Sequence, residues 1–132
     1  MNAAFGLAQL DRLEEIKEKR KKIFKKYLEN LKNTSDILLP KGKHESTDWM
    51  AIPLMTKNRM ALLTFLEKNG IQTRVCFAGN VTRHPAFCEY FQEFKNSDII
   101  MAQGFLLGAH HGMIEEDVDY ICDKIKEFFR DQ

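Results

Sequence analysis

The sequence NRMALLTFLEKNGIQTRVCFAGNVTRHP, residues 58–85, contains the patterns of a helix, a strand and a polar loop in succession. Apolar residues recur at helical spacing from Asn58 to Lys68, and Gly70 stands where a helix often ends on a left-handed residue. Residues 71–77 follow with the character of a strand. A helix that turns directly into a strand predicts a domain in which helices pack on a sheet.

The residues before this stretch predict one long helix and two strands. Residues 3–32 have apolar side chains near helical spacing and no proline, so we expect a single helix there. Residues 33–48 are polar and predict a loop around a short strand at 37–39. Residues 49–55 predict a strand, in which Pro53 favours an edge position or a bulge.

The residues after the loop predict further short helices, one strand and a terminal helix. One or two helical turns are expected at 87–94, and Asn96 or Ser97 is expected to cap a short helix that runs to about Gln103. A strand is predicted at 104–109. Residues 115–129 combine an acidic first turn with one apolar face, which is typical of a helix. The fold class is therefore α+β, with helices on one face of a small, mainly antiparallel sheet.

Length and composition indicate one ordinary globular domain. The chain has 132 residues, 44% hydrophobic and 30% charged, so residues 1–132 are expected to form a single domain with its own core. The net charge of +1 gives the molecule no overall electrostatic attraction to nucleic acid or to a membrane. Three widely spaced cysteines, an odd number, favour a reduced, cytoplasmic setting. No apolar stretch approaches the roughly 20 residues that cross a bilayer.

A basic run within the predicted first helix has two interpretations. Seven of the ten residues from Lys17 to Lys26 are Lys or Arg. They form either a stripe that binds nucleic acid or the solvated face of an amphipathic helix with acidic residues nearby. The second interpretation is favoured, because no aromatic residue is interleaved on the basic face.

The loop at 73–85 is the strongest candidate for a binding site. Arg74 and Arg83 offer planar donor forks that suit phosphate or carboxylate, and His84 titrates near neutral pH. Gly79 permits a close approach of backbone to ligand, and Asn80 adds an amide. Together these residues predict a site for a phosphorylated or sugar-nucleotide ligand. The alternative is a loop whose polar groups cap neighbouring elements.

Three other groups of residues are weaker candidates for a binding or catalytic site. His110 and His111 are adjacent, so on an extended segment they point to opposite sides, and no spaced metal-ligand set accompanies them. We therefore expect no metal site, with one histidine lining a pocket and the other facing solvent. Trp49 is expected in the core or as an apolar wall for a ring-shaped ligand. Burial is expected for Cys76, and a nucleophilic role is not.

Several segments together resemble one family. AAFGLAQLDRL, residues 3–13, is similar to the "AAxGLAQLxRL" segment of pyridoxal-phosphate sugar aminotransferases and their dehydratase relatives. The loop at 73–85 resembles the family's "TRxxFAGNxTRxP", which is the most specific match. Trp49 and residues 104–112, with the helix that follows, extend the resemblance over nearly the whole chain.

The resemblance implies a domain of a larger enzyme. In this family the region is the C-terminal small domain of a fold-type-I enzyme, and the preceding large domain carries the cofactor's phosphate loop and the Schiff-base lysine. The dehydratase branch has a histidine in place of that lysine. The implied cofactor is pyridoxal phosphate in the intact enzyme, with none expected on this chain alone, and no residue here is assigned a catalytic role. The isolated chain is therefore expected to be inactive.

The implied substrates are nucleotide-linked 4-keto-6-deoxy sugars of lipopolysaccharide biosynthesis. Residues 79–84 resemble the family loop that faces the sugar nucleotide, and the resemblance leaves both 3-dehydratase and aminotransferase open. Implied partners are a large domain or a second copy of the chain, with no membrane and no nucleic acid expected. A stand-alone interaction or nucleic-acid-binding module is the alternative function. The implied substrate-binding residues are Trp49, Arg74, Asn80, Arg83, His84 and His110.

Overall fold

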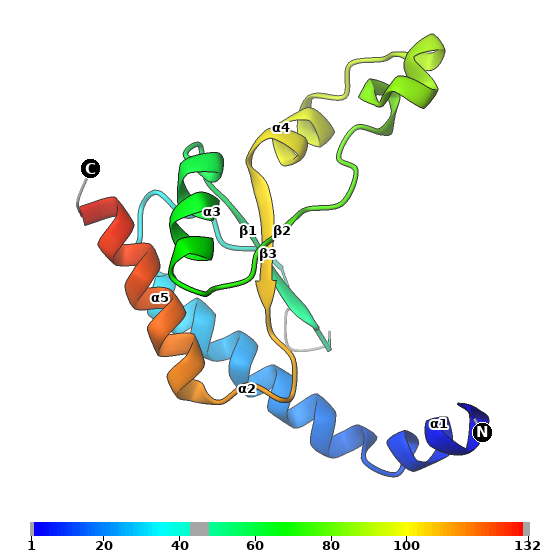
Figure 1. The fold of residues 1–132 in the computed structure, drawn as a ribbon, viewed down its shortest axis with the longest axis vertical. Helices are drawn as coiled ribbons and strands as arrows, with labels where there is room; N and C mark the ends of the chain where they lie inside the picture. The colour runs from blue at the N-terminus through cyan, green and yellow to red at the C-terminus, as the bar shows by residue number, and fades with distance from the viewer. Residues whose placement is uncertain (1, 43–47, 131–132) are drawn as a thin grey trace.

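A computed structural model describes residues 2–42 and 48–130 of the chain (Figure 1). The part of the predicted loop at 43–47 lies outside the described residues. The elements are α1 (Asn2–Leu10), α2 (Leu13–Leu31), β1 (Ala51–Met55), α3 (Arg59–Lys68), β2 (Arg74–Val75), the 3-10 helices η2 (Val81–Arg83) and η3 (Pro85–Tyr90), α4 (Lys95–Gln103), β3 (Gly104–Gly108) and α5 (Glu115–Arg130).

The three strands form an antiparallel sheet in the order β1-β3-β2. Ala51 pairs with Gly108 and Met55 with Gly104, while Arg74 of β2 pairs with Leu106 on the other side of β3. Pro53 therefore lies on an edge strand, as predicted, where its missing N–H costs the sheet no bond to a second neighbour.

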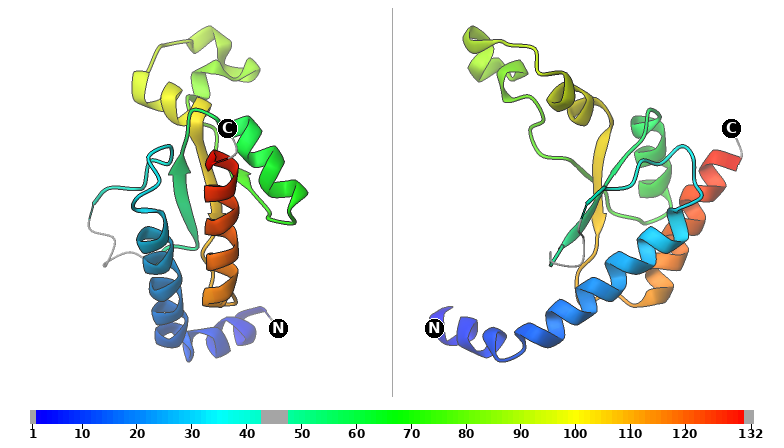
Figure 2. Two further views of the ribbon diagram at one scale, coloured as in Figure 1. Left: turned by 90° about the vertical axis from the view of Figure 1, so that its left-hand side faces the viewer. Right: turned by 180° about the vertical axis from the view of Figure 1, so that it is seen from behind.

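One face of the sheet carries the core. The buried side chains of the strands alternate, and α2, α3 and α5 pack on the face that they line (Figure 2). The predicted α+β class is confirmed. The largest fully buried side chains are Tyr27, Leu31, Ile52, Leu54, Leu62, Leu66, Phe105, Leu107, Val118, Cys122 and Ile125.

The prediction of a single helix over 3–32 is wrong. The chain leaves the helix at Asp11 and Arg12, where the Arg12 N–H bonds back three residues to the Gln9 carbonyl and Arg12 has ψ of 8°. This turn separates α2, whose apolar face packs on the body, from α1, in which residues 3–10 are exposed and which extends away from the body (Figure 1). Packing thus divides a run that is helical by local pattern alone.

The predicted strands at 71–77 and 37–39 are shorter in the structure. β2 consists of Arg74 and Val75, because Phe77 takes a positive φ of 49° and its N–H bonds to the Val75 carbonyl. That tight turn directs the chain off the sheet. The expected strand at 37–39 is reduced to one bridge between Leu38 and Met55.

Two helix boundaries follow the sequence closely, and a third does not. Gly70 has φ of 76°, its N–H bonds to the Glu67 carbonyl, and the Ile71 N–H bonds to the Leu66 carbonyl, so α3 ends in a Schellman motif. The terminal helix begins at Glu115 as predicted. α4, however, begins at Lys95, before either expected cap. The Phe94 N–H at its start is instead bonded by the Asp98 carboxylate.

Residues 76–94, here called the arm, leave the sheet after β2 and return to it through α4. The arm contains η2 and η3 and projects away from the helical layer, at the opposite end of the molecule from α1 (Figure 1). Among the described residues, no helix has both the length and the apolar composition that a membrane crossing requires.

Candidate functional site

Helix α4 is the platform that positions the first half of the arm. Gly79 has φ of 63°, and a Cβ atom at this position would overlap the Cβ of Met101. A side chain is therefore excluded by conformation and by space. This contact brings the loop at 79–84 directly against α4 and fixes which of its side chains face the helix.

Asn80 is the most deeply placed polar residue of the arm. Its side chain is only 2% exposed, and all its polar atoms are bonded within the chain. The Nδ2 amide donates to the Gln92 carbonyl and to Asp98, both at 2.9 Å, and Oδ1 accepts from the Thr82 N–H and hydroxyl. In this arrangement Asn80 shapes the loop, which is the capping role left open by the sequence.

Arg83 forms a two-point ion pair with Asp98. Its Nε donates to Oδ1, and Nη2 donates to Oδ2 at 3.1 Å. The guanidinium also lies over the Phe91 ring, 5.0 Å from its centroid. Hydrogen bonds from Arg83 and then Asn80 lower the pKa of the Asp98 carboxyl to about 2.

Arg74 and His84, the other two basic side chains of the loop, make fewer contacts within the chain than Arg83 does. The Arg74 guanidinium is exposed and donates from Nη1 to the Thr73 carbonyl, and it has no ion pair within the described part of the chain. Nε2 of His84 lies 2.8 Å from the Ala78 carbonyl oxygen, so this nitrogen is held by the loop itself.

The remaining predicted site residues lie at the other end of β3. Trp49 stacks on Phe24 with 5.5 Å between ring centroids and packs against the core. His110 is exposed, and its Nδ1 accepts a hydrogen bond from the Gly112 N–H at 3.2 Å. The Ala109 N–H bonds to the Met50 carbonyl, which holds these two segments together.

The six predicted residues therefore form two groups. Asn80, Arg83 and His84 lie beyond the Gly104 end of β3, whereas Trp49 and His110 lie beyond its Gly108 end. Five strand residues span about 15 Å. Arg74 stands beside the middle of the strand, opposite Leu106. Within one chain the structure does not bring all six to a single point.

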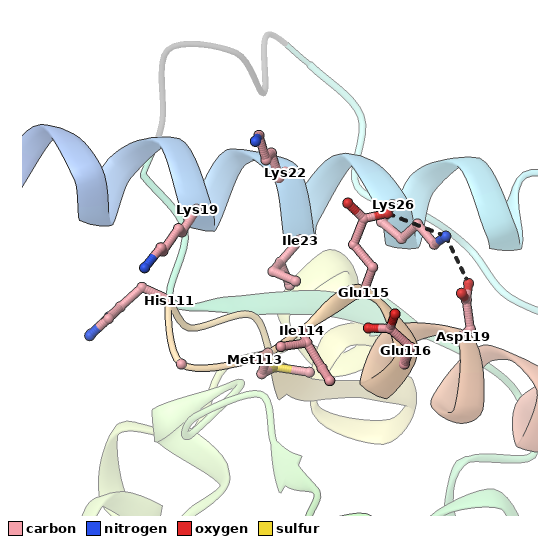
Figure 3. Close-up of a pocket in the computed structure, with 11 residues that line it drawn as sticks. Lys19, Lys22, Ile23, Lys26, His111, Met113, Ile114, Glu115, Glu116 and Asp119 are labelled. Carbon is pink, nitrogen blue, oxygen red and sulfur yellow. Dashed lines mark ion pairs between the residues drawn. The ribbon is translucent and has the colours of Figure 1, made fainter.

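His111, not His110, lines a surface groove (Figure 3). The groove runs between α2 and the start of α5, and Lys26 bonds across it to Glu115 and Asp119 at 3.6 and 3.1 Å. Lys19 and His111 lie toward its other end (Figure 3). One histidine in a pocket and one in solvent is the predicted arrangement.

Acidic neighbours offset most of the basic run on α2. Five of the seven basic residues at 17–26 form ion pairs, four of them with glutamates three or four residues away on the same helix. This pattern agrees with the solvated face of an amphipathic helix.

The three thiols are free: Cys122 is buried, Cys76 half-buried and Cys88 exposed. Across residues 2–42 and 48–130, no group of three or more His, Cys, Asp or Glu has an arrangement that holds a metal ion.

Asp98, on α4, is the residue that ties the arm to this helix, and the sequence did not reveal it. Its acidic side chain near the start of a helix predicts a favourable contact with the helix end. The pairing with Arg83 spans fifteen residues and depends on the loop being folded back on α4. The sequence contains no spacing signal for such a contact.

An α+β domain that carries its polar loop on a projecting arm is the class of protein that these features define. The chain belongs to the DegT/DnrJ/EryC1/StrS aminotransferase family, which it matches over residues 1–126.

Two curated relatives align with nearly the whole chain. It is similar to the lipopolysaccharide biosynthesis protein RfbH of Salmonella typhimurium, with 39% identity over 98% of this chain and 32% of the relative. It is also similar to the dTDP-4-dehydro-2,6-dideoxy-D-glucose 3-dehydratase of Saccharopolyspora spinosa, with 31% identity over 97% of this chain and 30% of the relative. The chain thus spans about a third of the length of these relatives.

The fold is also shared with solved structures. The E. coli GDP-4-keto-6-deoxy-D-mannose-3-dehydratase with bound hydrated PLP superposes with a TM-score of 0.80 at 21% identity. The match covers 92% of this chain and 33% of that structure. The resemblance inferred from the loop at 73–85 and the segment at 3–13 is confirmed at the level of family and fold.

Proposed function

We propose that this chain forms the C-terminal small domain of a pyridoxal-phosphate-dependent nucleotide-sugar enzyme. The reaction class is 3-dehydration or amino transfer, and the setting is lipopolysaccharide or O-antigen sugar biosynthesis in the cytoplasm. The observation that carries the proposal is the family match over residues 1–126, which includes the whole candidate loop. Similarity to a lipopolysaccharide biosynthesis protein supports the setting.

In this proposal the chain supplies part of the substrate pocket. Arg74 offers an exposed guanidinium without a carboxylate partner among the described residues, which suits a diphosphate. His84 is held through Nε2 and has its Nδ1 available for a ligand. Asn80 and Arg83 hold the loop that presents His84, and Arg74 is positioned by the pairing of β2 with β3.

The second group of residues forms a separate surface of the same proposed pocket. Trp49 is fixed by its stack on Phe24 and offers an apolar ring face, and His110 is exposed on the segment that is bonded to the segment after Trp49 through Ala109 and Met50. Because these two residues lie at the far end of β3, they contact a different part of the substrate or complete the pocket of a second chain.

The described residues do not fit pyridoxal phosphate as a resident group. Several lysines line surface grooves. On α2, Lys26 is tied to Glu115 and Asp119 and Lys19 to Glu15, and Lys57 lines a groove between β1 and α3. No lysine of the described chain stands in an enclosed cavity beside a phosphate-binding turn. The cofactor, which supplies the electron sink of the chemistry, is therefore assigned to the rest of the family enzyme.

The proposal is tested by titrating the ¹⁵N-labelled chain with dTDP-glucose and with GDP-mannose while amide signals are recorded. We expect saturable shifts at residues 73–84 and an approximately tenfold weaker affinity in Arg74→Gln, because one charge-assisted phosphate contact is lost.

The matched control is Lys32→Gln, which removes an exposed cation at the end of α2 and should leave the affinity unchanged. Shifts confined to the basic face of α2, or equal binding of single-stranded RNA that weakens steeply with salt, would contradict the proposal and favour the nucleic-acid alternative.

A further inference from the structure

Several separate contacts of the arm converge on one carboxylate. Asp98, in the first turns of α4, accepts from Arg83 through both oxygens, from the Asn80 amide at 2.9 Å and from the Phe94 N–H at 3.2 Å. These donors come from the loop after β2, from η2 and from the residue before α4. A single side chain thus joins the outgoing and returning halves of the arm.

The donors that Asp98 holds have few alternatives. Asn80 is buried, so losing one acceptor would leave a buried N–H without a partner. The backbone N–H of Phe94 lies before the helix and bonds to Asp98. The Arg83 guanidinium is packed on Phe91, which limits the directions in which it can seek another acceptor.

The contact with α4 also restricts how the loop can respond. Gly79 lies so close to Met101 that the loop has no room to move toward the helix. The Arg83–Asp98 ion pair, which joins the loop to the same helix, prevents the loop from moving away from α4. The loop at 79–84 is therefore clamped between a steric limit and an ion pair.

We propose that Asp98 is the positioning residue of the candidate site: its carboxylate fixes Arg83 and the loop at 79–84 on α4, so that His84 is held in one position relative to Arg74 on β2. The link to substrate presentation rests on the proposed function, whereas the clamp itself does not. Asp98 does not contact the ligand in this proposal; it acts through Arg83 and Asn80.

The clamp is tested by following the Arg83 Nε–H signal by NMR in the wild type and in Asp98→Asn, with Arg83→Lys used for assignment. In the wild type we expect a shifted signal protected from solvent exchange. In Asp98→Asn the exchange should accelerate by about tenfold, because a charge-assisted hydrogen bond is replaced by a neutral one. Asp98→Glu keeps the charge and should restore part of the protection.

Glu93→Gln is the matched control. Glu93 is an exposed carboxylate that also interacts electrostatically with Arg83, so its removal changes the local charge equally and leaves the Asp98 bonds in place. Amide signals of Ile52 and Leu107 in the core report whether each variant still folds. Unchanged Arg83 protection in Asp98→Asn, or an equal loss in Glu93→Gln, would overturn the clamp.

Acid titration gives a second readout. The Asp98 pKa is lowered to about 2. The ion pair therefore contributes fully to stability at pH values above the ordinary carboxyl pKa, and this contribution is lost as the pH falls through about 2. The Arg83 signal should accordingly persist at pH 3. Its disappearance between pH 4 and 5, where ordinary carboxyls titrate, would contradict the proposal. Failure of dTDP-glucose to bind the wild type counts against the proposed function alone, because the clamp is measured without ligand.

Discussion

At the scale of single residues, Tyr27 places a phenolic hydroxyl within the apolar core. The side chain is fully buried among the core residues of α2, and its hydroxyl has no hydrogen-bond partner in the structure. Burial also raises the pKa of Tyr27, so the hydroxyl stays protonated over the working range of pH. We expect Tyr27→Phe to raise the free energy of unfolding by about 1 kcal/mol in urea titrations, because an unsatisfied group is removed.

Tyr120→Phe provides the matched comparison. The Tyr120 hydroxyl donates to the Asn69 carbonyl at 3.0 Å on the surface, so the same substitution there should lower the free energy of unfolding slightly. A destabilised Tyr27→Phe variant would show that an ordered water, or a relaxed geometry, satisfies the buried hydroxyl.

The residue scale is also where sequence-based prediction of the site is least complete. The residue types of Arg74, Arg83 and His84 indicated an anion-binding loop, and the family resemblance followed from them. The engagement of Asn80 and Arg83 by Asp98 depends on the path of the arm, which local pattern does not encode. The separation of Trp49 and His110 from the arm similarly follows from strand register, not from residue type.

At the scale of elements, two left-handed glycines are expected to differ in what they support. Gly70 ends α3 with open space around its Cα, whereas Gly79 lies against Met101. Gly70→Ala should therefore cost about 1 kcal/mol of global stability through backbone strain alone. Gly79→Ala should displace the arm from α4 while changing global stability less, since among the arm's side chains only Asn80 is buried.

Denaturant unfolding combined with NMR shifts of arm amides distinguishes the two variants. If the amide signals of core residues shift as much as those of arm residues in Gly79→Ala, the arm is coupled to the body more tightly than its burial indicates.

Elements with strong local signals were predicted well, and those set by packing were not. The acidic start of α5 and the Gly70 end of α3 follow from dipole and capping chemistry, so the sequence was sufficient. The turn between α1 and α2 and the early end of β2 at Phe77 were missed. Both depend on where the chain must go next, and neither involves a proline or glycine at the break.

At the scale of the whole molecule, α1 and the arm present apolar surface at opposite ends of the body. Phe5, Leu7 and Leu10 are exposed on α1, and Phe77 and Tyr90 on the arm. We expect the chain to self-associate at high concentration, because contiguous apolar surface favours burial against another molecule. Phe5→Ser combined with Leu7→Ser should lower the average mass measured by sedimentation.

Ile114→Ser is the control for this prediction. Ile114 is also an exposed apolar side chain, but it stands beside polar and charged neighbours at the start of α5. Its substitution should leave the sedimentation profile unchanged. A monomeric wild type at the highest concentration reached would count against α1 as an association surface.

The central position of β3 fixes the distance between the arm at one of its ends and the turn at 109–114 at the other. Both neighbouring strands are bonded to it, so a residue inserted into β3 would reverse the facing of the side chains beyond the insertion and break the pairing with β1 or β2. Loops at its two ends are free of that constraint and can change length independently. Divergence within such a scaffold is therefore expected to remodel the arm or the turn at 109–114 separately, while the distance between them stays constant.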